Sequence, residues 1–159
     1  MSGTPQSPEQ ALPKITAILA EGLPCRLVVT GNSMLPFLRH QLDTVILAPL
    51  SGPVRRGDIL FYLRAPHLPI LHRVCKIRPD GILLLCGDAQ VGLEPVPPDR
   101  ILARVTAIDR NGKQVDCSSL TFRLTGLLWI LLRPVRPYIL AVLRKLGRLH
   151  EGDIYGKRH

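Results

Sequence analysis

Aromatic residues are scarce in this sequence, where they make up 4% of 159 residues. Proteins that bind single-stranded nucleic acid stack bases on aromatic side chains, so we expect no nucleic-acid partner. The four cysteines form no CxxC pair and no histidine lies at zinc-finger spacing, so we expect no metal site and no cofactor. Most of them lie in or beside apolar runs, which is typical of free core thiols. They are Cys25, Cys75, Cys86 and Cys117.

Long apolar runs are also missing. The longest uncharged stretch of the leucine-rich C-terminal part, residues 124–132, has nine residues. A helix that spans a bilayer needs about 20 apolar residues. The first residues (MSGTPQSPEQALPK) are polar and rich in proline, with no apolar segment of the kind found in secretion signals. We therefore expect neither a simple transmembrane helix nor a cleavable secretion signal.

Positive charge, in contrast, is in excess, with 21 basic against 12 acidic residues and a formal net charge of +9. Residues 1–119 hold 13 basic and 10 acidic residues, a net charge of +3. Residues 120–149 hold six basic residues and no acidic residue. Basic residues among many leucines are typical of a helix that binds an anionic membrane surface. We therefore expect residues 120–149 to contact a membrane surface.

The N-terminal part carries the signals of a short helix. Ser7 can cap it, Pro8 suits its first position, and Gln10 follows the cap by three residues. Apolar residues then recur at helical spacing as far as Gly22. We predict an amphipathic helix that covers one side of the core.

After this helix the pattern changes to six short β-like runs, which are separated by turn signals rich in Gly, Pro, Asn and Asp. Tight turns of this kind join antiparallel neighbours. We predict a mainly β fold, an open antiparallel barrel or sandwich of about six strands. The runs are residues 27–30, 44–47, 59–63, 70–77, 82–86 and 101–108.

Helical spacing of apolar residues returns after Ser119. Pro134 and Pro137 must interrupt it, which predicts two C-terminal amphipathic helices. These helices can lie on a membrane, form a shallow hairpin, or dock on the sheet or on a second subunit. The predicted organisation is an N-terminal tail and helix (1–25), a central β domain (26–119) and a basic helical tail (120–159).

Three segments place polar residues beside the ends of apolar strands. A Gly-Asn turn delivers Ser33, and Asp88 follows the fifth run. Alternation along residues 70–77 puts His72 on an aliphatic face, which keeps its imidazole neutral near pH 7, as a general base requires. Each also has a structural interpretation: a helix N-cap for Ser33, a hydrogen-bonded core histidine for His72 and a turn cap for Asp88.

Taken together, four motifs resemble the conserved boxes of signal peptidases and of the related self-cleaving repressor peptidases. In chain order they are GNSMxP (31–36), RGDILF (56–61), HRV (72–74) and GDA (87–89), within a region of similarity that covers about residues 26–108. In that clan the bacterial secretory enzymes use a lysine base, and the endoplasmic-reticulum type uses histidine. Because His72 stands in this slot, the chain resembles the histidine branch, and the resemblance implies a signal-peptidase-like fold with a catalytic central domain.

By this resemblance Ser33 is the nucleophile and His72 is the base that takes its proton. Serine needs such a base, and the imidazolium that forms needs a partner. Asp88 lies in the GD motif, but the histidine branch places its orienting acid several residues later, where this chain has Glu94. Asp88 and Glu94 are therefore rival candidates for the third catalytic residue.

The resemblance also implies an oxyanion hole, formed by the backbone N–H of Ser33 and a neighbouring donor, for which Gly31 is the candidate. The bacterial secretory enzymes carry a serine where this chain has Gly31, as the repressor peptidases do. A backbone amide or Asn32 must then substitute. Asp58 of the RGD turn is given a structural role and no chemistry.

The expected function is that of a serine endopeptidase (a hydrolase) of signal-peptidase type, which cleaves a leader or precursor peptide through an acyl-enzyme. The alternative is a membrane-associated module on the same fold that binds extended peptides without cutting them. A self-cleaving repressor is disfavoured, because the roughly 25 residues before the first strand are too few for a helix-turn-helix unit. Expected partners are a peptide or preprotein substrate and a membrane surface. The protein would be peripheral or shallowly inserted at the membrane, and otherwise cytoplasmic.

Overall fold

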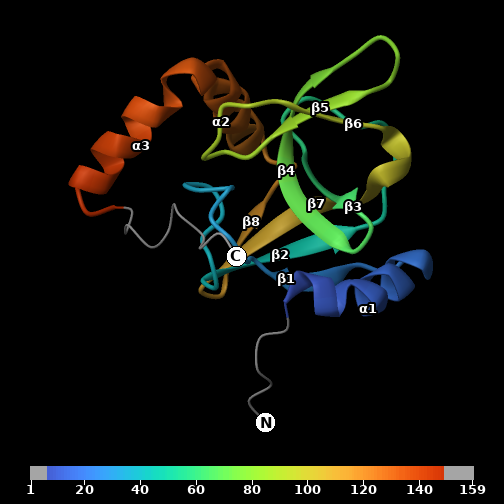
Figure 1. Cartoon of the computed structure of the whole chain (residues 1–159). Helices are drawn as coiled ribbons and strands as arrows, with labels where there is room; N and C mark the ends of the chain where they lie inside the picture. The colour runs from blue at the N-terminus through green and yellow to red at the C-terminus, as the bar shows by residue number, and fades with distance from the viewer. Residues whose placement is uncertain (1–6, 149–159) are drawn as a thin grey trace.

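The computed structural model describes residues 7–148 and contains one sheet of eight strands (Figure 1). The strand order is β1-β2-β7-β3-β4-β5-β6, with β8 paired to β7, and every pair is antiparallel. The prediction of a mainly β fold with an open antiparallel sheet is therefore confirmed. The strands are β1 (Cys25–Val28), β2 (Asp43–Ala48), β3 (Ile59–Ala65), β4 (Leu68–Ile77), β5 (Leu83–Cys86), β6 (Glu94–Val96), β7 (Ile101–Arg110) and β8 (Lys113–Asp116).

All six predicted runs form strands, and two further strands escaped the sequence reasoning. β6 has three residues with a proline at its centre, and β8 is mostly polar. Neither has the apolar alternation that marks a strand. The turn that joins β7 to β8 was predicted: Asn111 and Gly112 both have positive φ, 53° and 79°, as a tight hairpin turn requires.

Helix α1 (Pro8–Ala20) begins as predicted, with Ser7 and Gln10 forming a reciprocal capping box. Its buried face carries Leu12, Ile15 and Leu19, which join the larger of the core clusters. In Figure 1 the helix lies beside β1, at the opposite end of the molecule from the C-terminal helices. α1 therefore covers one side of the core, as expected.

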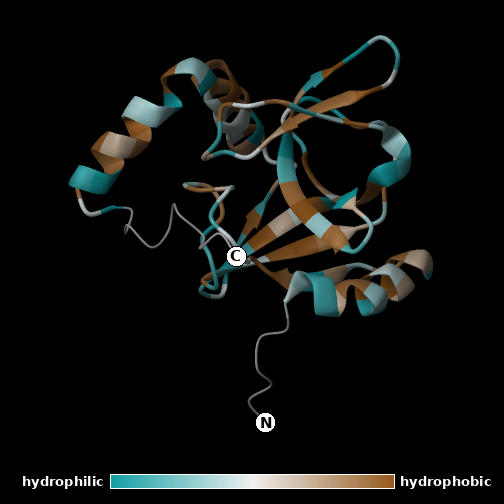
Figure 2. Ribbon diagram, in the orientation of Figure 1, coloured by the Kyte–Doolittle hydropathy of each residue, from teal (hydrophilic) through white to brown (hydrophobic). Residues whose placement is uncertain are grey.

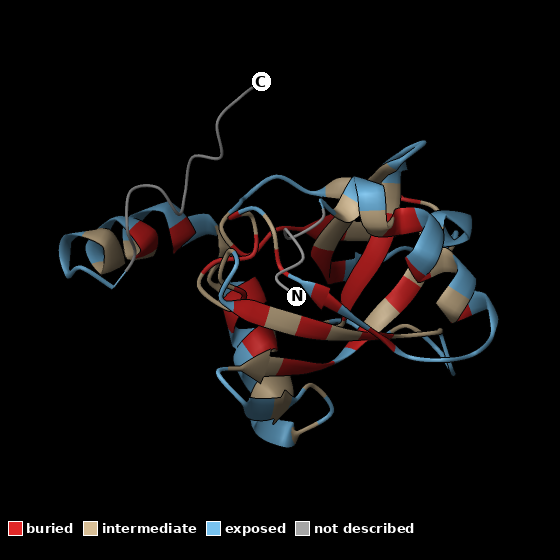
Figure 3. Ribbon diagram, turned by 90° about the horizontal axis from the view of Figure 1, so that it is seen from below, coloured by how far each residue is buried: buried red, intermediate tan, exposed pale blue. Residues whose placement is uncertain are grey.

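Residues 59–62 of β3 and 72–75 of β4 are buried in succession, so these parts of the two strands are buried on both faces. Figure 3 shows buried residues concentrated in the strands of the sheet. Phe61 of β3 packs in the larger core cluster with residues of α1, β1 and β2, whereas Leu60 and Tyr62 pack in a second cluster with residues of β4, β5 and β6. Side chains of successive strand residues point to opposite faces. The sheet thus separates two apolar layers, and His72 of β4 faces the second layer together with Ile70.

The C-terminal part forms two helices, α2 (Leu120–Leu131) and α3 (Arg136–Lys145), as predicted. A short 3₁₀ turn (Arg133–Val135) that contains Pro134 separates them, whereas Pro137 lies in the first turn of α3, where proline is tolerated. Within residues 7–148, no single helix is long and apolar enough to cross a membrane. The two helices meet this length and composition test as a pair, bent by 64°.

Two buried side chains fasten these helices to the loop after β5. Trp129 of α2 donates its indole N–H to the carbonyl of Asp88 at 2.9 Å. Arg136 of α3 is fully buried and donates to the carbonyls of Gly87, Gln90 and Trp129 at 3.2, 2.9 and 2.9 Å. The bonds to the carbonyls of Gly87 and Trp129 are buried, and they satisfy acceptors that would otherwise be unpaired. Of the placements open for this segment, the structure shows docking on the sheet domain.

Candidate active site

Ser33 lies in the turn that follows β1 and is half-buried. Gly31, two residues earlier, has a φ of +84°, a left-handed conformation that favours glycine. The carbonyl of Ser33 accepts a hydrogen bond from the N–H of Ala89 at 2.8 Å. A Cβ atom on Gly87 would lie 2.5 Å from that carbonyl oxygen, so this close approach requires glycine. The loop after β1 therefore lies directly against the loop after β5.

His72 lies on β4 opposite Leu60 of β3, and its side chain is almost completely buried. Its Nδ1 atom is 3.1 Å from the hydroxyl of Tyr62. Burial and, to a smaller extent, the positive charge of Arg64 lower the pKa of His72 to about 4, against the opposing effect of the negative charge of Glu94. The imidazole is therefore neutral at pH 7, the state predicted from its aliphatic face.

Glu94, at the start of β6, is joined to His72 through Tyr62. The Tyr62 hydroxyl lies 2.9 Å from Glu94 Oε2, and the same carboxylate oxygen is 4.0 Å from His72 Nδ1. Arg64 donates to both carboxylate oxygens, at 2.9 and 2.6 Å. The bonds from Arg64 are the main reason why the pKa of Glu94 is lowered, with Tyr62 adding to the effect. Glu94 is thus an ionised carboxylate in the immediate surroundings of His72.

Asp88 is held by a different partner. Arg73 donates to both of its carboxylate oxygens, at 2.8 and 2.7 Å, and both side chains are fully buried. Arg73 also donates to the carbonyl of Gly57 at 3.0 Å and lies over the ring of Phe37. Because Arg73 directly follows His72 along a strand, the two side chains project from opposite faces of β4. Of the two rival acids, Glu94 lies near His72, whereas Asp88 forms a buried ion pair with Arg73.

A short chain of contacts connects the Ser33 loop with β4. Ser33 binds Ala89, the preceding residue Asp88 binds Arg73, and Arg73 is the neighbour of His72. A groove of about 70 Å³ also runs between β1 and the start of β4, and Ser33, Ile70 and Leu71 are among its lining residues. The hydrogen bonds within the described part of the chain do not include one between the Ser33 hydroxyl and His72. Catalytic hydrogen bonds are often long before substrate binds.

The amide of Gly31, the other expected oxyanion donor, has a partner inside its own loop. Its N–H donates to Nδ1 of His40 at 2.9 Å, and so this amide is already engaged inside the loop. Sequence reasoning could not foresee this bond, because it depends on how the chain between the two residues folds back. The backbone N–H of Ser33 is then the candidate donor that remains, and Asn32 beside it is buried.

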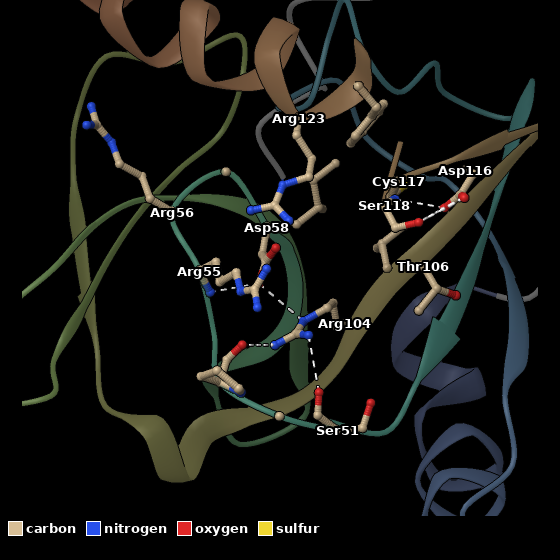
Figure 4. A pocket seen from close by; sticks show the side chains of 16 residues that line it. Ser51, Arg55, Arg56, Asp58, Arg104, Thr106, Asp116, Cys117, Ser118 and Arg123 are labelled. Carbon is tan, nitrogen blue, oxygen red and sulfur yellow. Dashed lines mark hydrogen bonds and ion pairs between the residues drawn. The ribbon is translucent and has the colours of Figure 1, made fainter. Parts of the chain in front are cut away.

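A separate cavity of about 510 Å³ is lined by Arg55, Arg104 and Arg123 among other residues (Figure 4). Arg104 is engaged by internal partners: it donates to the carbonyl of Pro53 at 2.7 Å and pairs with Asp58 at 3.2 Å. Asp58 also accepts from the backbone N–H of Arg55 at 2.8 Å. Asp58 thus holds the turn before β3, in keeping with the structural role assigned to it, and the cavity adds no group to the site.

Two residues of the site, Tyr62 and Arg64, were missed by the sequence reasoning. Tyr62 and Arg64 are two residues apart on β3, and both lie on the face of the sheet that carries His72. Only the pairing of β3 with β4 shows that they share this face. Within residues 7–148, no group of three or more His, Cys, Asp or Glu residues could hold a metal ion, and all four cysteines are free. The candidate residues themselves supply a hydroxyl, a neutral imidazole and a carboxylate.

The lowered pKa of His72 predicts a loss of stability in weak acid. The unfolded chain takes up a proton near the ordinary value of 6.5, whereas the folded chain does so near 4. Stability should therefore decline as the pH falls from about 6.5 to about 4, because the unfolded state binds more protons there. Urea unfolding across this range measures the decline, which His72→Gln should reduce. His67→Asn, at an exposed turn, should leave it unchanged.

The chain was compared with family models, with curated proteins and with solved structures. No family model matches it. No curated protein and no solved structure matches it either. The function must therefore be inferred from the residues and their geometry.

Proposed function

We propose that the protein is a serine endopeptidase in which Ser33 is the nucleophile and His72 is the general base. The four motifs that resemble signal peptidases support this proposal, and so does the site. The main supporting observation is the buried, neutral imidazole of His72, linked through Tyr62 to the carboxylate of Glu94. One ring nitrogen of His72 faces Tyr62, which is bound to the carboxylate of Glu94. The other ring nitrogen is then suited to receive a proton.

The proposed reaction has two halves. Oγ of Ser33 attacks the carbonyl carbon of the scissile peptide bond while His72 takes the hydroxyl proton. His72 then gives this proton to the leaving amine, which leaves an acyl-enzyme. A water molecule attacks the ester, His72 takes one of its protons, and that proton returns to Ser33 as the ester bond breaks. The Ser33 amide stabilises the negative oxygen, for which each donor contributes about 3–4 kcal/mol.

The proposed substrate is an extended peptide. The groove beside Ser33 lies between β1, which ends the strand order of the sheet, and the start of β4. An extended peptide can pair with backbone groups along such an edge while its side chains enter small pockets. At about 70 Å³ the groove has room for small side chains next to the nucleophile.

The experiment that tests this proposal is cleavage of a peptide library, read by mass spectrometry, in the presence of phospholipid. Wild-type protein should cut extended peptides at defined bonds next to small residues, and Ser33→Ala should cut none. Cleavage that is equal in both proteins would refute the proposal. Binding of peptides without cleavage by either protein would favour the alternative of a peptide-binding module.

We further propose that the C-terminal helices hold the protein at an anionic membrane surface. Large apolar side chains of α2 and α3 are exposed, although Trp129, Ile130 and Leu140 of the same helices are buried. Figure 2 shows hydrophobic and hydrophilic residues alternating along these two helices. Basic residues accompany them, with no acidic residue in residues 120–148, and this charge complements anionic lipid. The exposed apolar residues are Leu120, Leu124, Leu128, Leu131, Val135, Tyr138, Val142 and Leu146.

This attachment predicts a loss of vesicle binding when the exposed leucines of α2 are made polar. Leu124→Ser combined with Leu128→Ser should weaken binding to phosphatidylglycerol vesicles by about tenfold or more, because apolar area no longer enters the lipid. Leu23→Ser combined with Leu42→Ser, exposed leucines outside the tail, is the matched control. Co-sedimentation measures both. Equal binding of the α2 variant and wild type would contradict the attachment.

A further inference from the structure

The hydroxyl of Tyr62 lies between a carboxylate, which can only accept a hydrogen bond, and a histidine nitrogen, which can accept or donate one depending on the tautomer. It lies 2.9 Å from the Glu94 carboxylate and 3.1 Å from Nδ1 of His72. The side chain of Tyr62 is fully buried, so water does not compete for these positions. A phenol carries one proton and can therefore donate to one of its two neighbours.

The carboxylate decides where that proton goes. Glu94 is ionised and bound by Arg64, and an ionised carboxylate can accept but not donate. If Tyr62 donated to His72, its oxygen would face the carboxylate with no proton between two acceptors only 2.9 Å apart. If Tyr62 donates to Glu94, its oxygen is free to accept from an N–H at Nδ1 of His72. The second arrangement satisfies every group, and the bond to a charged acceptor is the stronger one.

We propose that Tyr62 is a positioning residue that fixes His72 in the tautomer with the proton on Nδ1 and the lone pair on Nε2. This inference rests on the proposed function, in which Nε2 of His72 is the atom that takes the Ser33 proton. It assigns Glu94 an indirect role: the carboxylate orients Tyr62, and Tyr62 orients the histidine. In the triads in which a carboxylate contacts the histidine directly, one hydrogen bond performs both tasks.

A single proton moves in the base step. The Ser33 proton goes to Nε2, and Nδ1 keeps its own proton, so His72 becomes an imidazolium. Burial and the bond to Glu94 raise the pKa of Tyr62 well above its ordinary value, and Tyr62 therefore remains a neutral phenol throughout. Glu94, 4.0 Å from Nδ1, stabilises the positive charge that forms, while Arg64 keeps the carboxylate ionised before it forms.

The tautomer can be read directly in the resting protein by ¹⁵N NMR of histidine-labelled protein. The sequence has five histidines, and the signals that disappear in His72→Gln identify those of His72. In wild type we expect an amine-like shift for Nδ1 and a pyridine-like shift for Nε2. Tyr62→Phe removes the acceptor without removing the ring, and both shifts should move toward the average of the two tautomers. Tyr138→Phe, on the exposed face of α3, should leave them unchanged.

Kinetic constants supply a second measurement, which the loss of a tyrosine with a merely structural role would not change. Tyr62→Phe should lower kcat by about 10- to 1000-fold with little change in KM, less than the roughly 10⁴-fold loss when a triad histidine is held in the wrong tautomer. Glu94→Gln keeps an acceptor for the hydroxyl but removes the charge. It should lower kcat while it leaves the wild-type tautomer in place.

The two proposals fail in different ways. A wild-type protein with the proton on Nε2, or a Tyr62→Phe variant with unchanged shifts, would overturn the role of Tyr62 even if peptides are cleaved at Ser33. A protein with the expected tautomer that cleaves no peptide would support the role of Tyr62 in orienting His72 and refute the peptidase function.

Discussion

Replacing Ser33 by alanine is expected to lower kcat/KM for peptide cleavage by roughly four to six orders of magnitude, while the fold persists. Loss of a serine nucleophile removes the acyl-enzyme route, and what remains is catalysis by binding and by the oxyanion donor. The structural contact of Ser33 uses its backbone carbonyl, which binds Ala89, and alanine retains it. We therefore expect the free energy of unfolding to change by about 0.5 kcal/mol or less.

The measurement is the initial rate of cleavage of the best peptide from the library, with urea unfolding of both proteins as the check of folding. Ser51→Ala is the matched control: this serine is exposed, and its contact to Arg104 also uses its backbone carbonyl. Ser51→Ala should cleave at the wild-type rate. A folded Ser33→Ala protein with more than a few per cent of wild-type activity would exclude Ser33 as the nucleophile.

Peptide binding and peptide cleavage, measured on the same proteins, separate the two functions that the sequence allows. A peptidase that has lost its nucleophile still has its groove, and Ser33→Ala should bind the best peptide about as tightly as wild type binds it. A binding module would show the same affinity in both proteins without any cleavage. Measurements of affinity and of cleavage together therefore show which of the two functions the protein has.

The fold was largely predictable because its signals are local. Alternating or continuous apolar runs mark β2, β3, β4 and β7, and the Ser7 cap marks the start of α1. The strands that were missed, β6 and β8, are held by neighbouring strands and not by their own apolar pattern. The split of the tail into two helices followed from Pro134, since a proline inside a helix removes a backbone hydrogen bond.

The candidate site was predictable in part. Ser33 and His72 could be named from short motifs and from the alternation along β4. The choice between Asp88 and Glu94 could not be made, because it depends on which face of the sheet each acid reaches. Tyr62 required knowledge that β3 pairs with β4 in the register that sets Leu60 opposite His72. Pairings between distant parts of the chain are set by tertiary packing, and local sequence carries little information about them.

The largest expected loss of stability comes from Arg73→Met. Arg73 and Asp88 are both fully buried and form a bidentate pair. Removing the guanidinium leaves a buried carboxylate without a counter-charge, which typically costs about 3–5 kcal/mol. The carbonyl of Gly57 loses a donor as well. Urea unfolding measures the loss, and Arg78→Met, which breaks an exposed pair with Asp80, is the control, with an expected cost of about 1 kcal/mol or less.

The double variant Arg73→Met/Asp88→Leu tests whether the loss of stability in Arg73→Met comes from the unpaired charge of Asp88. If it does, the double variant should recover a large part of the stability that Arg73→Met loses. Activity should not recover with it, because the double variant lacks the ion pair that ties the loop after β5 to β4, and this loop carries Ala89, which binds Ser33. Recovery of stability without recovery of cleavage would show that the pair maintains the relative position of the Ser33 loop and β4. Equal stability losses in Arg73→Met and Arg78→Met would contradict this role.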